Sequence, residues 1–203
     1  MDYKKIQTIL GNLAHEAVEK EFKAVRQTHF LIVDRKIIVP AGRSLNIGTS
    51  WKVNPFDSKK FDPYIGWIRI CLQTKKDATF PLEPSKPGYS RRPDLADINT
   101  HDIYEVKPKA RHKAGLRQLK AFKQLLEQAD REYLFFRSKT TSGQGEFFET
   151  LNNPLWKGGK WVPKLSCALT IGGIGKIPIT FSNEGDGIIL WEINRRELIK
   201  DPV

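Results

Sequence analysis

Apolar residues recur every three or four positions in two segments of the chain, which is the spacing of one face of an α-helix. The first segment covers about residues 3–27 and the second about residues 115–129. Both are therefore predicted to be amphipathic helices that bury one face. The apolar positions are Ile6, Ile9, Leu10, Leu13, Ala14, Ala17, Val18, Phe22 and Val25, and then Leu116, Leu119, Phe122, Leu125, Leu126 and Ala129.

Outside these segments, short runs rich in β-branched and aromatic residues predict strands. The predicted strands are residues 30–34, 36–39, 65–72, 132–136, 165–170, 177–181 and 187–193. Residues 143–164 have a loop-like composition and contain Trp156 and Trp161 between lysines. These tryptophans could stack on nucleic-acid bases, but we expect them to pack in the core or to anchor the loop.

A β-hairpin is predicted between Pro93 and Lys107. Residues 93–98 and 103–107 have strand character, and the four residues between them, Asn-Thr-His-Asp, favour a turn. Pro108 is expected to end the second strand as a paired central strand. The hairpin therefore brings two short strands of this part of the chain side by side.

Two carboxylates and a lysine share one face of this hairpin. If Ile98 lies opposite Ile103, Asp94 lies opposite Lys107, and side-chain alternation puts Asp94, Glu105 and Lys107 on the same face. Such a group can hold a divalent cation against a phosphodiester. The alternative is a solvated hairpin with ordinary surface charges. The apolar neighbours of Glu105 favour a core strand, and hence the functional interpretation.

A strongly basic segment follows the hairpin at once. It contains Lys107, Lys109, Arg111, Lys113, Arg117, Lys120 and Lys123, with His112 and no acidic residue. The second predicted helix would carry most of these charges on its exposed side, where they would attract phosphate in a salt-dependent way. A solvated helix face is the alternative explanation for such a run.

The first predicted helix carries Gly11, His15 and Glu19 at intervals of four residues, so they form one row along the helix. The glycine would allow another backbone to approach closely, and the two polar side chains could then reach a site on a neighbouring sheet. An ordinary exposed pair is the alternative. Glu16 and Glu21 are the rival carboxylates, and Glu21 falls near the centre of the apolar stripe.

Composition limits the class of protein. The 203 residues carry a formal net charge of +11 with a pI of about 9.6, and 39% of them are hydrophobic. These values predict a single packed domain with an anionic partner, nucleic acid first and an anionic membrane or acidic protein second. No apolar run is long enough to insert in a membrane. Two cysteines are too few for a disulfide framework or a four-cysteine zinc site.

Taken together, these motifs resemble those of the PD-(D/E)XK nuclease superfamily, and most closely the restriction-endonuclease-fold toxin domains of bacterial polymorphic toxins. The resemblance is carried by Arg-Pro-Asp at 92–94, Glu-Val-Lys-Pro at 105–108, the segment 115–119 with Phe122, and the row Gly11, His15 and Glu19. It covers residues 11–22 and 91–126. Residues 29–86 and 138–203 would be β-rich elaborations. Many relatives have tyrosine at the position of Phe122.

The resemblance implies one α/β domain over residues 1–203, with a mixed β-sheet flanked by helices and the site at one sheet edge. Asp94, Glu105 and Glu19 would then be metal ligands for Mg²⁺, with Mn²⁺ as the alternative ion. Lys107 would orient the attacking water or stabilise developing charge. His15 would ligate or orient, and Gln118 would position the water or the phosphate.

The function implied is metal-dependent hydrolysis of DNA, as in a bacterial toxin. The alternatives are an RNase of the same fold, including one acting on tRNA, a phage, mobile-element or repair nuclease, and a non-catalytic nucleic-acid-binding module. A toxin would act in the cytoplasm after delivery by secretion, and an acidic immunity protein would be a further partner. Contacts with nucleic acid are expected from Arg92, Lys109, Arg111, Lys113, Arg117 and Lys120.

Overall fold

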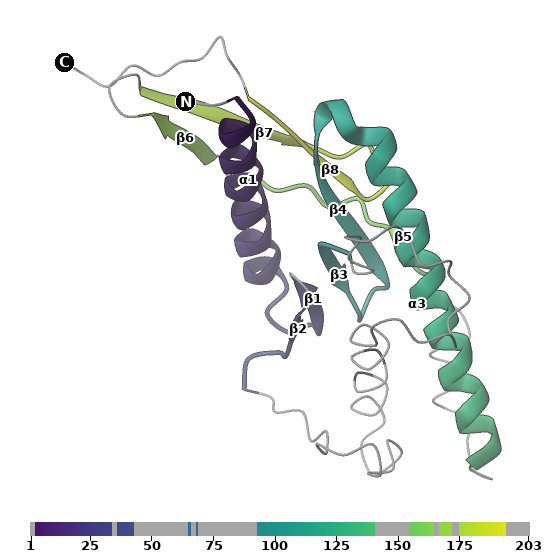
Figure 1. Cartoon of the computed structure of the whole chain (residues 1–203). Coiled ribbons are helices and arrows are strands. Elements are labelled where there is room, and N and C mark those ends of the chain that lie inside the picture. Colours follow the sequence, from purple (N-terminus) through teal and green to yellow (C-terminus); the bar gives the residue numbers. More distant parts are fainter. Residues whose placement is uncertain are drawn as a thin grey trace.

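A computed structural model describes residues 3–33, 36–42, 65, 68, 93–140, 155–164, 167–171 and 175–193. Two long helices and a mixed sheet dominate this part of the chain (Figure 1). The elements are α1 (Tyr3–Val25), β1 (Leu31–Val33), β2 (Lys36–Ile38), β3 (Leu95–Asp97), β4 (Asp102–Pro108), the 3₁₀ helix η1 (Lys109–Arg111), α3 (His112–Thr140), β5 (Lys157–Gly158), β6 (Cys167–Ile171), β7 (Gly175–Ser182) and β8 (Ile188–Ile193).

The strands form one sheet in the order β2-β1-β3-β4-β8-β7-β6, and β5 pairs with the beginning of β4. Strand β4 is central. It runs antiparallel to β3 on one side and parallel to β8 on the other. The predicted α/β class with a mixed sheet and flanking helices is therefore confirmed.

The two helices lie on opposite faces of the sheet (Figure 1), and alternation along β4 explains why. Tyr104 and Val106 pack in one core cluster with the apolar stripe of α1, whereas Ile103 packs in the other with Leu119 and further residues of α3. Both faces of β4 are thus covered. Neither described helix is long and apolar enough to cross a membrane.

Several predicted elements are confirmed with small shifts in their bounds. These are the first helix, the two early strands, the hairpin and the three late strands. The register of the hairpin is different, because Leu95 pairs with Tyr104 and Ala96 with Ile103. The pairing is displaced by two residues from the predicted one. Since two is the side-chain period of a strand, the predicted face of Asp94 is unchanged.

Two predicted strands are wrong. Residues 132–136 belong to α3, which continues to Thr140 instead of ending near residue 129. A short apolar run fits a buried strand or a buried helix equally well by its pattern, and here neither glycine nor proline interrupts residues 116–131 before it. Of residues 65–72, the described Ile65 and Ile68 have helical backbone and are fully buried.

Three side chains that were hard to interpret in sequence have clear packing roles. Trp156 is fully buried, and its Nε1 donates to Asp130 Oδ2 at 2.8 Å, which confirms a core role. Trp161 packs edge-on against Phe22, with 5.2 Å between ring centroids. The buried carboxylate of Glu21 accepts the Lys164 backbone N–H at 2.8 and 3.0 Å. Glu21 therefore holds the segment around Lys164, which follows β5, against α1.

Gly187, which immediately precedes β8, is expected to tolerate no side chain. Its φ is +87°, and an added Cβ would lie 2.6 Å from Gly158 Cα and 2.7 Å from the Ile103 carbonyl oxygen. We expect Gly187→Ala to lower the free energy of unfolding by about 3 kcal/mol or more. Gly185→Ala is the control, since its φ is +90° but the nearest described atom to an added Cβ is Lys160 Cγ, at 3.8 Å.

The Gly185→Ala control should lose only the cost of the backbone conformation, about 1–2 kcal/mol. Urea denaturation of both variants measures the difference. Equal losses would show that the close packing of β5 against the start of β8 contributes nothing measurable.

Candidate functional site

Strand β4 extends beyond the pairing region of β3, and the candidate site occupies the place where the pairing stops. Pro93 has no N–H with which to extend the ladder, and β3 starts at Leu95. The Asp94 carboxylate takes over instead, since its Oδ2 accepts the Val106 backbone N–H at 2.8 Å. The side chain of Asp94 is therefore fixed at the edge of the sheet beside β4.

Asp94, Glu105 and Lys107 meet at this edge, as predicted. The observed register places Asp94 next to Glu105 across the strand pair, and the Asp94 backbone N–H donates to Glu105 Oε2 at 3.4 Å. Lys107 Nζ lies 2.5 Å from Glu105 Oε1 and 4.0 Å from Asp94 Oδ2. Side-chain exposure is 26% for Asp94 but only 3% for Glu105. One carboxylate is thus open to solvent while the other is buried behind it.

The electrostatics of Glu105 are unusual. Burial raises the pKa of its carboxyl group to about 7, and the neighbouring Asp94 carboxylate adds to the rise. Lys107 opposes both effects. A buried carboxyl group that ionises near neutral pH is costly to keep unless a positive charge compensates it. Lys107 compensates the Glu105 carboxylate only in part, since the pKa of Glu105 remains raised beside it.

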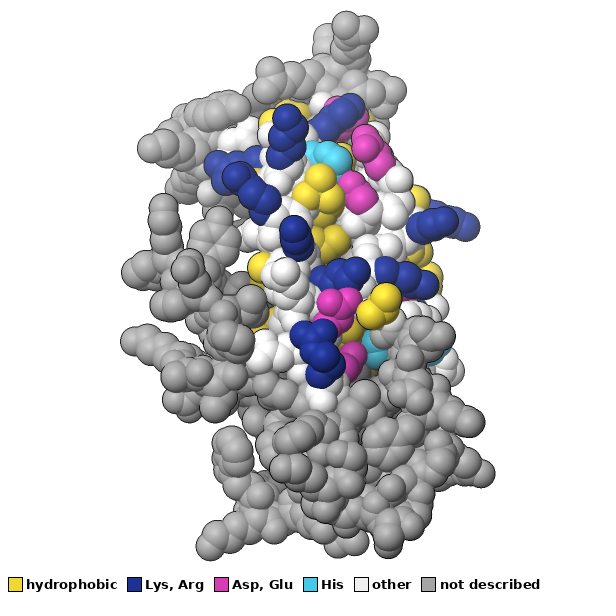
Figure 2. Space-filling model, turned by 90° about the vertical axis from the view of Figure 1, so that its right-hand side faces the viewer, with side chains coloured by type: hydrophobic (Ala, Val, Ile, Leu, Met, Phe, Trp, Pro, Cys, Tyr) yellow, Lys and Arg dark blue, Asp and Glu magenta, His cyan; other side chains and the backbone are white. Residues whose placement is uncertain are grey.

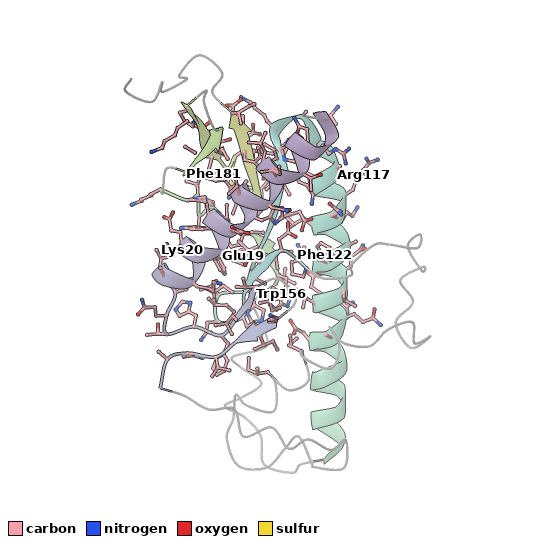
Figure 3. All side chains as sticks on the ribbon, turned by 60° about the vertical axis from the view of Figure 1, so that its left-hand side comes forward. Glu19, Lys20, Arg117, Phe122, Trp156 and Phe181 are labelled. Atoms are coloured by element: carbon pink, nitrogen blue, oxygen red, sulfur yellow. The ribbon has the colours of Figure 1, made fainter. Side chains whose placement is uncertain are left out.

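Helix α1 brings His15 to the site. His15 Nδ1 lies 4.0 Å from Asp94 Oδ2, with a third of the histidine side chain exposed. Glu19 follows one turn later on the side of α1 that faces α3, whereas Lys20 points the other way (Figure 3). Gly11 does not have the predicted role within the described part of the chain. The only described atom near a Cβ on Gly11 would be Trp191 Cζ2, at an ordinary 3.9 Å, so no described backbone approaches it closely.

Helix α3 contributes a close contact that the sequence did not identify. A Cβ on Gly115 would lie 3.1 Å from both Lys107 Cγ and Ile188 Cγ2. The glycine therefore lets α3 lie directly over the stem of Lys107. The sequence signal for such a contact is a glycine at the start of a predicted amphipathic helix. Gln118, three residues later, is half-buried and forms no hydrogen bond with the site among the described side chains.

Five of the six basic residues predicted to contact nucleic acid are exposed on η1 and α3. Lysine and arginine side chains gather on this face of the molecule, with some acidic side chains among them (Figure 2). Lys109 is paired with Glu192 at 2.9 Å. Arg92 lies outside the described residues. The exposed members are Lys109, Arg111, Lys113, Arg117 and Lys120. Phe122 is buried, which confirms its packing role.

The donor set of the site fits a hard divalent cation. Asp94 and Glu105 offer carboxylate oxygens, which Mg²⁺ and Mn²⁺ prefer, and the imidazole of His15 lies beside Asp94. The raised pKa of Glu105 points the same way, because a bound cation would favour the ionised carboxylate. The arrangement could therefore place a divalent cation beside Lys107, at an edge of the sheet that is partly open to solvent.

No protein-family model, curated protein or solved structure matches the chain.

Proposed function

We propose that the protein is a metal-dependent nuclease of the PD-(D/E)XK type. One observation carries the proposal: Asp94, Glu105 and Lys107 converge at the end of the β3–β4 pairing, with Glu105 buried and its pKa raised to about 7. A solvated hairpin would leave both carboxylates exposed with ordinary titration. A buried acid beside a second acid and a lysine is typical of a catalytic site.

The surroundings of the hairpin support the restriction-endonuclease-like core. The hairpin lies in the middle of a mixed sheet, with α1 on one face and α3 on the other (Figure 1). The first helix presents His15 toward Asp94, and the second approaches Lys107 through Gly115. Both helices therefore approach the same strand ends, and this supports the proposed core.

The side chains would divide the chemistry of phosphodiester hydrolysis among them. Asp94 and Glu105 would hold Mg²⁺ or Mn²⁺, with Glu19 from α1 as a further ligand; the ion, when bound, would polarise the phosphate and acidify a water. Lys107 would stabilise negative charge that develops on the phosphate. His15 would orient Asp94 from the side of α1.

Two further groups would position the substrate. Gln118 would hold the water or the phosphate from α3. The lysines and arginines of η1 and α3 would bind the phosphate backbone, with an affinity that falls steeply as salt is added. DNA is the substrate class we propose, and RNA is the alternative that the assay below distinguishes.

The defining experiment is a cleavage assay with duplex DNA, single-stranded DNA and total RNA in Mg²⁺, in Mn²⁺ and in EDTA. We expect cleavage only with a divalent metal. The variants Asp94→Asn, Glu105→Gln and Lys107→Met should each lose at least about 10²–10³-fold in rate, because each removes a group that acts on the reacting phosphate.

Matched controls come from the same hairpin and from an early strand. Asp102→Asn changes an acid at the far end of β4, and Lys36→Met removes an exposed lysine of β2; both should cleave at the wild-type rate. Cleavage that persists in EDTA, or in Asp94→Asn and Glu105→Gln, would overturn the proposal. Binding without any cleavage would instead identify a non-catalytic nucleic-acid-binding module.

A further inference from the structure

A second group of metal-ligating side chains lies away from the Asp94–Glu105–Lys107 site. His112 is the first residue of α3, and Glu184 and Asp186 lie in the turn between β7 and β8. One ligand atom from each of the three lies within 4.8 Å of the others. His112 Nε2 is 2.6 Å from Asp186 Oδ2, and both side chains are about one quarter exposed.

The turn that carries the two acids is firmly held. The Asn183 side chain donates to the carbonyl oxygens of Gly159 and Trp161 at 3.0 and 2.8 Å and accepts the Gly185 N–H at 2.8 Å. Asp186 Oδ1 accepts the Ile188 N–H at 2.9 Å, which leaves Oδ2 directed at His112. The carboxylate is thus oriented by the backbone, as metal-binding carboxylates commonly are.

We propose that His112, Glu184 and Asp186 bind a divalent transition-metal ion, Zn²⁺ in the first instance. One imidazole nitrogen with two carboxylates favours such an ion over Mg²⁺, which takes oxygen ligands. Around tetrahedral zinc, neighbouring ligand atoms lie about 3.4 Å apart. The His112–Asp186 pair has to open by less than 1 Å to reach that separation, and Glu184, which is exposed, can close on them. Water completes the coordination.

This ion would join two segments that are distant in sequence. It would hold the beginning of α3 to the β7–β8 turn, three residues before Gly115 packs on Lys107. The same turn leads into β8 through Gly187, whose carbonyl oxygen accepts the Glu105 N–H at 2.9 Å. The proposed role is therefore structural, and it does not depend on the proposed nuclease activity.

Zinc titration of the full chain tests the proposal. The Glu105→Gln variant serves as the background, so that binding at the Asp94–Glu105 pair does not contribute. We expect calorimetry to show one equivalent of Zn²⁺ binding to His112, Glu184 and Asp186 in this background. The bound ion should raise the melting temperature. Adding His112→Asn or Glu184→Gln should weaken binding by more than about tenfold. Glu16→Gln, an exposed glutamate of α1, is the matched control.

Side-chain NMR identifies the ligand directly, because the chain has only four histidines. Zinc should move the His112 Nε2 resonance and leave those of His29 and His101 in place. Since Glu184 is exposed, Glu184→Gln will report on binding even if His112→Asn fails to fold. The absence of zinc binding in the Glu105→Gln background, or full affinity in Glu184→Gln with an unmoved His112 resonance, would overturn the proposal.

Discussion

Glu105→Gln is expected to make the metal-free protein more stable at pH 8 while abolishing its proposed activity. The carboxyl group is buried beside the Asp94 carboxylate, and its pKa is raised from 4.5 to about 7. Above pH 7 the folded state must keep a charge that burial disfavours. Glutamine keeps the shape and one oxygen acceptor for Lys107 without that charge. We expect a gain of about 1–3 kcal/mol.

The pH dependence has a definite sign. Below pH 4.5, Glu105 is protonated in both the folded and the unfolded state. Between pH 4.5 and about 7, the folded protein holds this proton more tightly, so its stability falls as pH rises. Above pH 7 the stability that this proton contributes is fully lost. The advantage of Glu105→Gln should therefore appear across this window and be absent at pH 4.5.

Urea unfolding of both proteins in EDTA, at several pH values from 4.5 to 8, measures the effect. Glu192→Gln, an exposed glutamate of β8, is the control and should show no comparable gain. His101 also contributes to the wild-type curve, because burial lowers its pKa to about 4 and its contribution is lost as pH falls from 6.5. That contribution cancels in the difference. A Glu105→Gln protein less stable than wild type at pH 8 would contradict the argument.

A gain in stability with a loss of activity would separate functional from structural roles. Residues that build the core destabilise the protein when they are replaced. Residues kept for chemistry are often held in an unfavourable environment, so their removal relieves the fold. Glu105 meets the second description, since burial and the Asp94 carboxylate raise its pKa more than Lys107 and the Asp94 backbone N–H lower it.

The sequence predicts the candidate site better than it predicts the pairing that builds it. The expected register places Asp94 opposite Lys107, whereas the observed register, extended one residue beyond the start of β3, places Asp94 opposite Glu105. The face survives this error because the displacement is two residues, one full side-chain period. The true register depends on where β3 starts, and the Asp94 carboxylate that replaces the missing ladder partner is a contact no pattern reveals.

Contacts between distant segments are the main part that the sequence leaves out. His112 and Asp186 are 74 residues apart, and nothing local to either indicates the other. Residues 132–136 show a related limit, because an apolar run has no period of its own and the preceding helix decides its structure. Helical stripes and late strands are predicted well, since each is encoded within a few turns or residues of the chain.

Asp97→Ala is expected to lower the free energy of unfolding more than any of the substitutions at glycines or at Glu105. The Asp97 side chain is fully buried. Its Oδ2 accepts from Arg26 Nε at 3.1 Å and lies 2.7 Å from His29 Nδ1. Its Oδ1 accepts the backbone N–H groups of Asn99 and Thr100 at 3.0 and 3.3 Å. One carboxylate thus joins the end of α1 to the β3–β4 turn.

Alanine would leave the Arg26 guanidinium without its carboxylate. That group is 13% exposed and lies over the Phe22 ring at 4.3 Å and the Trp161 ring at 5.0 Å. A buried charge deprived of its partner costs about 3–5 kcal/mol, and two backbone donors lose their acceptor as well. Removing Arg26 together with Asp97 should recover part of the loss, because no unpaired charge then remains.

The control is Asp102→Ala, since Asp102 faces Asp97 across the same strand pair. Its carboxylate accepts from the exposed Thr100 hydroxyl and lies 3.7 Å from an exposed Lys157, so we expect a loss of only about 0–1 kcal/mol. Urea unfolding of the three variants compares them directly. If Asp97→Ala were no more destabilising than Asp102→Ala, the carboxylate would not be what fastens α1 to the hairpin. Other contacts of α1 would then have to be what keeps His15, which this helix carries, close to Asp94.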